Sequence, residues 1–223
     1  MAELRLLSLA GVAVVVSLVA AGCAGDGDGA VDPGATVAPA TTDLSDRELA
    51  GIVRSPEPAV DAIAVPSLTN PGEAAEFRAD PDEFLAVYFG YTNCPDVCPT
   101  TMADWAVSLR RLPPDLAERV DTMMVTVDPD RDNDILSGYV TSFVADAEAA
   151  GTTDADLLAA AAEPFGVSYD VVENDEGEIE VSHSGFLYLV DDEGELVVTW
   201  PFGLSSQDMA ADVEQLFVEK GLA

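Results

Sequence analysis

Basic side chains are scarce in this sequence of 223 residues. Nine Lys and Arg residues stand against 42 Asp and Glu residues, which gives a formal net charge of −33 at pH 7. Binding to nucleic acid depends on cations that neutralise phosphates, so this imbalance excludes nucleic acid as a partner. The acidic residues are spread along the whole chain, which is typical of a solvated surface in an organism that lives in salt. Steering of cations or of a basic partner is the functional alternative.

The sequence also has no hydrophobic run at its N-terminus that is long enough for a typical membrane span. The uncharged stretch that ends at Ala21 covers about 16 residues, which is short for a membrane span but fits the core of a signal peptide. The small residues that follow lead directly to Cys23. This arrangement resembles a bacterial lipoprotein signal, in which the chain is cleaved before the cysteine and lipid is attached to its sulfur. Ala20 stands where that signal usually has leucine, and a plain uncleaved anchor is the alternative.

These features predict three regions along the chain. Residues 1–22 are the expected signal peptide, and residues 23–48, rich in Gly, Pro and Asp, are the expected flexible tether. Residues 49–223 are the expected domain, because 48% hydrophobic residues are ample for one packed core and few for two. We therefore expect an exported domain, held by lipid on the extracytoplasmic face of the cell membrane.

Strand and helix patterns alternate inside the domain. We expect strands within 59–68, 75–77, 84–91 and 120–128, hairpins at 168–183 and 185–200, and helices at 99–112, 133–146, 153–164 and 205–220. This order predicts an α/β fold with a mixed central sheet, helices on both faces and a late hairpin that adds antiparallel strands. The order is compatible with a thioredoxin-like fold and with other three-layer sandwiches.

Cysteine is scarce too, with three in the chain. If Cys23 carries lipid, Cys94 and Cys98 remain, in the stretch FGYTNCPDVCPTT, and an exported location permits a disulfide between them. Proline is favoured at the first position of a helix, so Pro99 places Cys98 near the N-cap. The helix dipole and the free backbone N–H groups there favour a thiolate. The sequence therefore predicts at least one reactive sulfur.

The spacing of the two cysteines leaves their role open. In a helical turn, side chains four positions apart have Cβ atoms within roughly 6 Å of each other. That separation suits a redox disulfide between Cys94 and Cys98, and it also suits two thiolates on one metal ion. A purely structural bridge is the third reading, although closing so short a loop removes little chain entropy.

Histidine occurs once, as His183, just before an apolar strand. An isolated histidine is commonly an exposed or merely hydrogen-bonded ring. Together with the two thiols, however, its imidazole can complete a Cys2His metal site. Two soft thiolates and one imidazole suit Cu(I). Zinc is the alternative, because Cys2His with a water is a known catalytic zinc set.

The segments FGYTNCPDVCPTT, VTVDPDRD and SHSGFLYLVD resemble the Sco/SenC family of copper-handling, thioredoxin-like proteins. They stand in the family's order, and the resemblance covers residues from about Ile63 to the C-terminus. It implies a thioredoxin-like three-layer sandwich in which Cys94, Cys98 and His183 bind copper. It also implies an outer-sphere role for Asp128, with Asp130 and Asp132 nearby. The alternative is that this segment is a solvated loop that caps a helix and has no role at the metal site.

The resemblance further implies a membrane-tethered copper chaperone. Its partner would be the copper A site of cytochrome c oxidase subunit II, or another cuproprotein. A thiol-disulfide reductase that acts on the cysteines of that site is the alternative function. The chain departs from the family pattern at Asn93, where a histidine is often found, and at the segment RDND, where RDTP is common.

Overall fold

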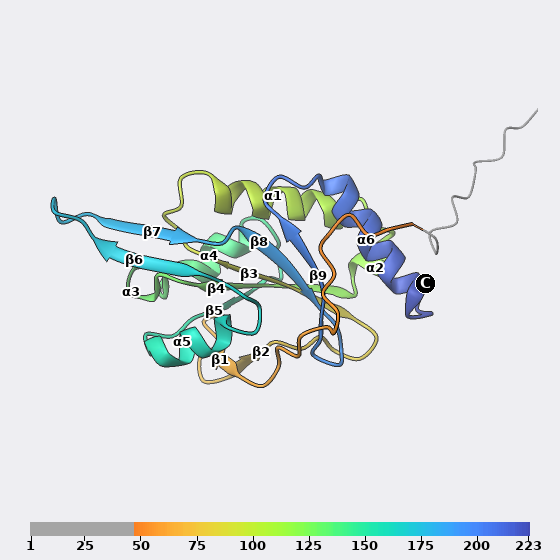
Figure 1. The fold of residues 1–223 in the computed structure, drawn as a ribbon, viewed down its shortest axis with the longest axis horizontal. Coiled ribbons are helices and arrows are strands. Elements are labelled where there is room, and N and C mark those ends of the chain that lie inside the picture. The colour runs from red at the N-terminus through yellow and green to blue at the C-terminus, as the bar shows by residue number, and fades with distance from the viewer. Residues whose placement is uncertain (1–46) are drawn as a thin grey trace, which may run out of the picture. The chain divides into compact units, whose positions relative to one another are not determined.

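The computed structural model describes residues 47–223, and a five-stranded sheet lies at their centre (Figure 1). Its strand order is β5–β4–β3–β8–β9. These strands are β3 (Phe84–Gly90), β4 (Val120–Thr126), β5 (Glu148–Ala150), β8 (Phe186–Val190) and β9 (Leu196–Pro201). Strands β3, β4 and β5 are parallel, whereas β8 runs antiparallel to β3 and β9 runs antiparallel to β8. The expected mixed sheet is confirmed.

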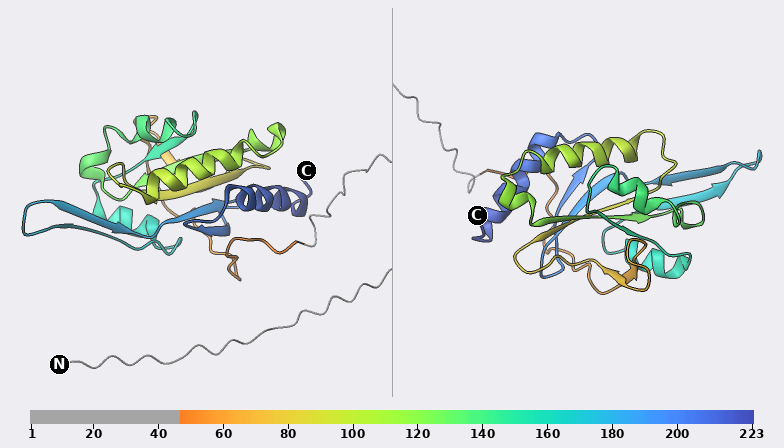
Figure 2. Two further views of the ribbon diagram at one scale, coloured as in Figure 1. Left: turned by 90° about the horizontal axis from the view of Figure 1, so that it is seen from above. Right: turned by 180° about the vertical axis from the view of Figure 1, so that it is seen from behind.

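Helices cover both faces of this sheet (Figures 1 and 2). The helices are α1 (Val97–Leu109), α2 (Pro114–Ala117), α3 (Pro129–Asp132), α4 (Leu136–Thr141), α5 (Ala155–Ala162) and α6 (Ser206–Glu219). Helices α1 and α6 pack side by side on one face. Helix α5 lies on the other face, beside the two-stranded sheet of β1 (Ala64–Pro66) and β2 (Ala74–Glu76).

Strand β3 has no charged residue, and all its residues are buried, because both faces of the sheet are covered. Successive side chains of a strand point to opposite faces. Phe84 packs edge-on against Phe217 of α6, with ring centroids 4.8 Å apart. On the opposite face, Phe89 packs against Phe165, just after α5, at 5.2 Å. The core therefore continues through the sheet, and the end of β3 is held rigidly where the cysteine segment begins.

A second hairpin projects beyond the central sheet (Figures 1 and 2). It consists of β6 (Tyr169–Glu173) and β7 (Ile179–His183), which pair only with each other among the described strands. Both hairpins expected from the sequence are thus confirmed. The last residue of β7 is His183, so the projecting hairpin carries the imidazole at its base.

Two expected helices have different bounds in the structure. Helix α1 begins at Val97, with Asp96 at the N-cap position, so the expectation of Pro99 as its first residue is wrong. Proline is tolerated at the third position because the first N–H groups of a helix have no intrahelical partner. The helix expected over residues 133–146 is shorter at both ends and consists of α4 alone, and the short helix α3 precedes it.

Residues 47–51 are fastened to helix α6 by Asp212, whose side chain is fully buried. Its carboxylate pairs with the Arg47 guanidinium and accepts hydrogen bonds of 2.9 Å from the backbone N–H groups of Ala50 and Gly51. It also accepts one of 2.9 Å from the Trp200 indole. Buried carboxylates are stabilised by such pairing. The described domain therefore includes Arg47.

The expected signal peptide, Cys23 and all but the last two residues of the expected tether lie outside the described residues. Among residues 47–223, no helix is long and apolar enough to cross a membrane.

Candidate metal centre

The connection from β3 to α1 carries both cysteines. Cys94 precedes the helix and is partly buried, and Cys98 is the second residue of α1 and is 0% exposed. The Cys98 backbone N–H donates a hydrogen bond to Cys94 Sγ, at 3.3 Å. No disulfide joins the two sulfurs in this structure.

His183 reaches the same place from the base of the β6–β7 hairpin. Its Nε2 atom lies 3.3 Å from Cys98 Sγ, and its Nδ1 atom lies 3.0 Å from the carbonyl oxygen of Ser184. A carbonyl oxygen only accepts, so Nδ1 carries the proton and Nε2 keeps a free lone pair. Burial lowers the pKa of His183, although hydrogen bonds to the backbone oppose this effect. The ring is therefore neutral at pH 7, as a metal ligand must be.

The three predicted donor side chains come together. The sulfur atoms of Cys94 and Cys98 and a ring nitrogen of His183 all lie within 4.8 Å of one another. A hollow of about 270 Å³ opens beside them and is lined in part by Tyr91, Pro95 and Val181. Two sulfurs and one imidazole are a soft ligand set, which suits Cu(I) and also matches a known zinc set.

The two thiols differ in their acidity. Burial raises the pKa of the Cys98 thiol to about 12. Burial acts the same way on Cys94, but hydrogen bonds from the backbone N–H groups of Cys98 and Asp96, together with those from the Cys98 and Tyr91 side chains, outweigh it and lower the pKa of Cys94. The expectation that the helix terminus makes Cys98 the thiolate is wrong, because this side chain is sealed inside the core. The reactive sulfur is Cys94.

Tyr88, Tyr91 and Tyr139 lie near the sulfurs, and none of them was predicted as part of the site. Burial raises the pKa of Tyr91 to about 12, and negative charge on Cys94 adds to that effect. Burial also raises the pKa values of Tyr88 and Tyr139, and charge on the cysteines adds to it. All three phenols therefore stay protonated beside the thiols. Tyr88 and Tyr91 belong to the run FLAVYFGY, where aromatic residues are typical of a buried strand, so the sequence did not indicate that they lie beside the sulfurs.

The acidic segment after β4 contacts the cysteine segment through Asp132. The Asp132 carboxylate accepts hydrogen bonds from Thr92 N at 2.9 Å, Thr92 Oγ1 at 2.5 Å and Thr126 Oγ1 at 2.7 Å. Asp128 instead pairs with Arg131. The outer-sphere role of Asp128 stays a prediction, and Asp132 is the residue that fixes the chain two positions before Cys94.

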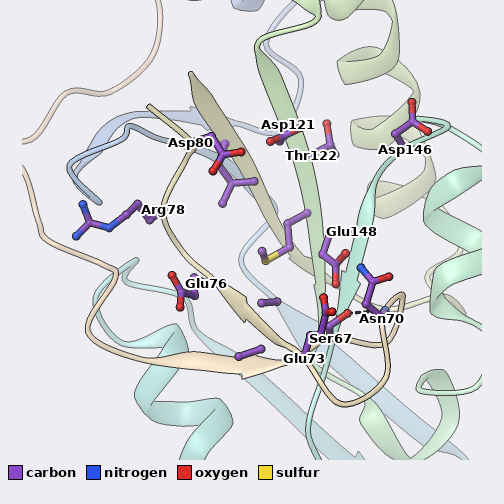
Figure 3. A pocket seen from close by; sticks show the side chains of 14 residues that line it. Ser67, Asn70, Glu73, Glu76, Arg78, Asp80, Asp121, Thr122, Asp146 and Glu148 are labelled. Carbon is purple, nitrogen blue, oxygen red and sulfur yellow. Dashed lines mark hydrogen bonds between the residues drawn. The ribbon is translucent and has the colours of Figure 1, made fainter. Parts of the chain in front are cut away.

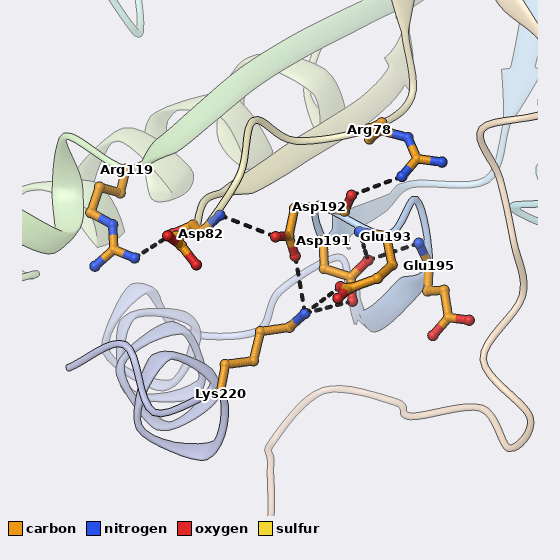
Figure 4. Close-up of polar contacts among 8 residues, drawn as sticks. All are labelled: Arg78, Asp82, Arg119, Asp191, Asp192, Glu193, Glu195 and Lys220. Atoms are coloured by element: carbon orange, nitrogen blue, oxygen red, sulfur yellow. Dashed lines mark hydrogen bonds and ion pairs between the residues drawn. The ribbon is translucent and has the colours of Figure 1, made fainter.

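Two other acidic groups lie apart from these donors. A cavity of about 450 Å³ is lined by carboxylates and by Arg78, and it shares no lining residue with the sulfur site (Figure 3). Its acidic lining residues are Glu73, Glu76, Asp80, Asp121, Asp146 and Glu148. The other group is Asp191, Asp192 and Glu193, whose carboxylates already hold the ammonium of Lys220 (Figure 4).

A mixed sheet with helices on both faces, and with a CxxxC segment between a central strand and the following helix, defines a thioredoxin-like domain with a Cys2His centre. The SCO1/SenC family model matches residues 69–218, which is more than half of the chain. The chain therefore belongs to the SCO1/SenC family.

Individual relatives agree with this assignment. Apo Sco1 from Thermus thermophilus is 27% identical, with a TM-score of 0.65 over 77% of this chain and 99% of that one. ScoI from Bradyrhizobium japonicum, solved with copper bound, is 26% identical, with a TM-score of 0.59 over 70% and 99%. The mouse mitochondrial SCO2 homologue is 33% identical over 125 residues, which are 54% of this chain and 47% of that protein. The chain spans about half the length of the curated relatives it matches.

Proposed function

We propose that this chain is a copper chaperone that binds Cu(I) through Cys94, Cys98 and His183. The observation that carries the proposal is the convergence of the three donor atoms within 4.8 Å. The neutral imidazole, with its lone pair toward Cys98, supports it further. The copper-bound ScoI structure is that of a relative with the same fold, which favours copper over zinc for this ligand set.

The differing exposure of the donors suits a protein that releases its metal. Cys98 is sealed in the core, whereas Cys94 is partly exposed. A thiolate of the partner can therefore approach the ion from the Cys94 side and replace the ligands one at a time. Each exchange keeps the ion bound to sulfur, so it never passes free through water.

The partner and the location follow from the family and from the expected N-terminus. Membership of the SCO1/SenC family supports copper handling for cytochrome c oxidase. We propose the copper A site of oxidase subunit II, or another cuproprotein, as the acceptor. Lipid on Cys23 would tether the domain to the extracytoplasmic face of the membrane.

Copper binding to the purified full chain tests this function. We expect one Cu(I) per chain in competition with a chromophoric Cu(I) chelator, and binding at least about tenfold weaker in His183→Ala. Cys94→Ala and Cys98→Ala should each weaken binding at least as much, because each removes a thiolate. Wild-type affinity in the His183→Ala variant would refute the three-ligand site.

A thiol-disulfide reductase is the second candidate, favoured by the different pKa values of the two thiols. The Cys94 thiolate would attack a partner disulfide, forming a mixed disulfide and releasing one partner thiolate. Cys98 would then attack Cys94 Sγ and pass its proton to the departing partner sulfur, which closes the Cys94–Cys98 disulfide and releases the second partner sulfur as a thiol. The chain loses two electrons and the partner gains them.

The two functions differ in their dependence on the imidazole. Reduction of a disulfide substrate should persist in His183→Ala, whereas copper binding should not. Reduction that disappears with His183 while both thiols remain reactive would point to a metal-dependent process. Measuring both activities on the same preparation therefore separates the candidates.

A further inference from the structure

A buried hydroxyl without a hydrogen-bond partner lies beside the metal centre. It belongs to Tyr88 on β3, whose side chain is 0% exposed. It makes no hydrogen bond within residues 47–223. Burying an unpaired hydroxyl destabilises a folded protein, and nearly all buried polar groups are paired. This unpaired group therefore calls for a functional explanation.

The Tyr88 ring meets the donor residues directly. A Cβ atom built on Gly90 would lie 2.7 Å from Tyr88 Cε1 and 3.1 Å from Cys98 Sγ, so both side chains lie against the same point of β3. The ring also packs edge-on against His183, with centroids 6.0 Å apart. The neighbouring Thr101 hydroxyl donates its own proton to the Val97 carbonyl, at 2.8 Å. Tyr88 thus adjoins two of the three donors.

We propose that the Tyr88 hydroxyl donates a hydrogen bond to the Cys98 sulfur when that sulfur is a metal-bound thiolate. This inference rests on the proposed copper-binding function. A thiolate is a stronger acceptor than a thiol, because hydrogen bonds to charged groups contribute more than neutral ones. Two thiolates with one Cu(I) leave a net negative charge in a buried place, where a donor aimed at the sulfur is most effective.

The unpaired hydroxyl of the empty site becomes paired in the loaded site. Tyr88 therefore stabilises the loaded site relative to the empty one.

The Tyr88→Phe variant tests the proposal, because it removes only the hydroxyl. We expect Cu(I) binding about tenfold weaker than in the wild-type full chain, measured by chelator competition. We expect the thermal midpoint of the copper-free variant to equal or exceed that of the wild type, because a group without a partner has been removed.

Tyr188→Phe is the matched control. Tyr188 lies on the neighbouring strand β8, is 0% exposed and also has a hydroxyl without a partner. Its ring packs on the opposite face of the sheet, against Phe165 and Phe89, with centroids 5.3 and 6.3 Å away. This variant should have the same effect on the thermal midpoint and leave Cu(I) affinity unchanged.

The outcomes separate the proposal from the function on which it rests. Wild-type Cu(I) affinity in Tyr88→Phe, with normal loss in His183→Ala, would overturn the role of Tyr88 alone. A lowered thermal midpoint in copper-free Tyr88→Phe would also overturn it, because the hydroxyl would then be paired in the empty protein. Absence of Cu(I) binding by the wild type would overturn both.

Discussion

The Nε2 atom of His183 lies 3.3 Å from the Sγ atom of Cys98, although 85 positions separate the two residues in the sequence. One side chain comes from the first turn of α1 and the other from the end of β7. The site therefore exists only when the projecting hairpin is seated against the main sheet. Because Nδ1 is bonded to the Ser184 carbonyl, the ring presents its lone pair to the site without any change of tautomer.

Copper binding should release protons from the thiols and none from the imidazole. The pKa of Cys98, raised to about 12 by burial, means that this thiol gives up a full proton at pH 7. The lowered pKa of Cys94 means that it gives up one proton or less, and neutral His183 gives up none. We expect between about one and two protons per Cu(I), and affinity that rises with pH.

Calorimetry in buffers of different ionisation enthalpy measures this proton number. His183→Ala should release the same number of protons at lower affinity, because the imidazole is already neutral. A smaller number in that variant would show that the ring is charged in the empty site.

The copper-free protein should react with alkylating agents at Cys94 first. A thiolate is the nucleophile, and Cys94 combines partial exposure with a lowered pKa, whereas Cys98 is sealed and its pKa is raised. Iodoacetamide should therefore label Cys98→Ser, which keeps Cys94, much faster than Cys94→Ser, as followed by mass spectrometry. Equal rates in the two variants would contradict the assignment of Cys94 as the attacking sulfur.

The strongest sequence signals were those of buried strands and tight turns. The apolar runs at residues 84–91 and 120–128 became the parallel centre of the sheet, and the NDEG and DDEG turns became hairpins. The Asp154 side chain caps α5 by accepting hydrogen bonds from the backbone N–H groups of Asp156 and Leu157. In these places the local preference and the final packing agree.

Other features depended on contacts that no local pattern reveals. Strand β5 has the sequence EAA, which has little β propensity, and only its pairing with β4 makes it a strand. The sealing of Cys98 and the bonding of Asp132 to Thr92 join segments that are distant in the sequence. The donor set could be proposed from residue types, but the division of roles between the two sulfurs needed the fold.

Asp132 should matter more than Asp128 for both stability and copper binding. Asp132→Ala leaves the Thr92 N–H and the hydroxyls of Thr92 and Thr126 without their acceptor, in a site that is 0% exposed. We expect a loss of about 2–3 kcal/mol in the free energy of unfolding, measured by denaturant titration. Cu(I) affinity should fall as well, because the chain before Cys94 is no longer held.

Asp128→Ala is the control for this prediction, since it changes the same acidic segment. It breaks the ion pair with Arg131, whose side chain is 32% exposed, so that water can solvate the guanidinium. The loss of stability should therefore be smaller than in Asp132→Ala. A larger effect of Asp128→Ala on Cu(I) affinity would instead support the outer-sphere role expected from the sequence.

Lys220, the single lysine of the chain, should stabilise the C-terminal helix at neutral pH, and this contribution should be lost at acid pH. Lys220 Nζ lies 3.0 Å from Asp191, 3.2 Å from Asp192 and 2.6 Å from Glu193, at the turn between β8 and β9 (Figure 4). The Asp82 N–H and Lys220 lower the pKa of Asp192 to about 2. A depressed acid pKa stabilises the fold above the unfolded value, near 4, and this contribution disappears as pH falls from about 4 to about 2.

Lys220→Gln should therefore lose about 1 kcal/mol or less at pH 7, as expected for a partly exposed pair. The difference from the wild type should shrink below about pH 4, as measured by denaturant titration across that range. A difference that persists unchanged at pH 2 would show that Lys220 acts by packing rather than by charge.

Removing one charge from the acidic cavity should stabilise the protein at neutral pH. Burial raises the pKa of Asp121, and the nearby Asp80 carboxylate raises it further (Figure 3). A raised acid pKa means that the charged form is unfavourable in the folded state, so stability is lost as pH rises through that value. Asp121→Asn should gain at most about 1 kcal/mol at low ionic strength, because the site is partly exposed.

The matched control is Asp134→Asn. The exposed Asp134 has no ion pair among the described residues, so Asp134→Asn lowers net charge equally without relieving a cluster. If the gain of Asp121→Asn over Asp134→Asn vanishes in about 1 M salt, where the Debye length is roughly 3 Å, local repulsion is its cause. A gain independent of salt would assign it to desolvation of the carboxylate instead.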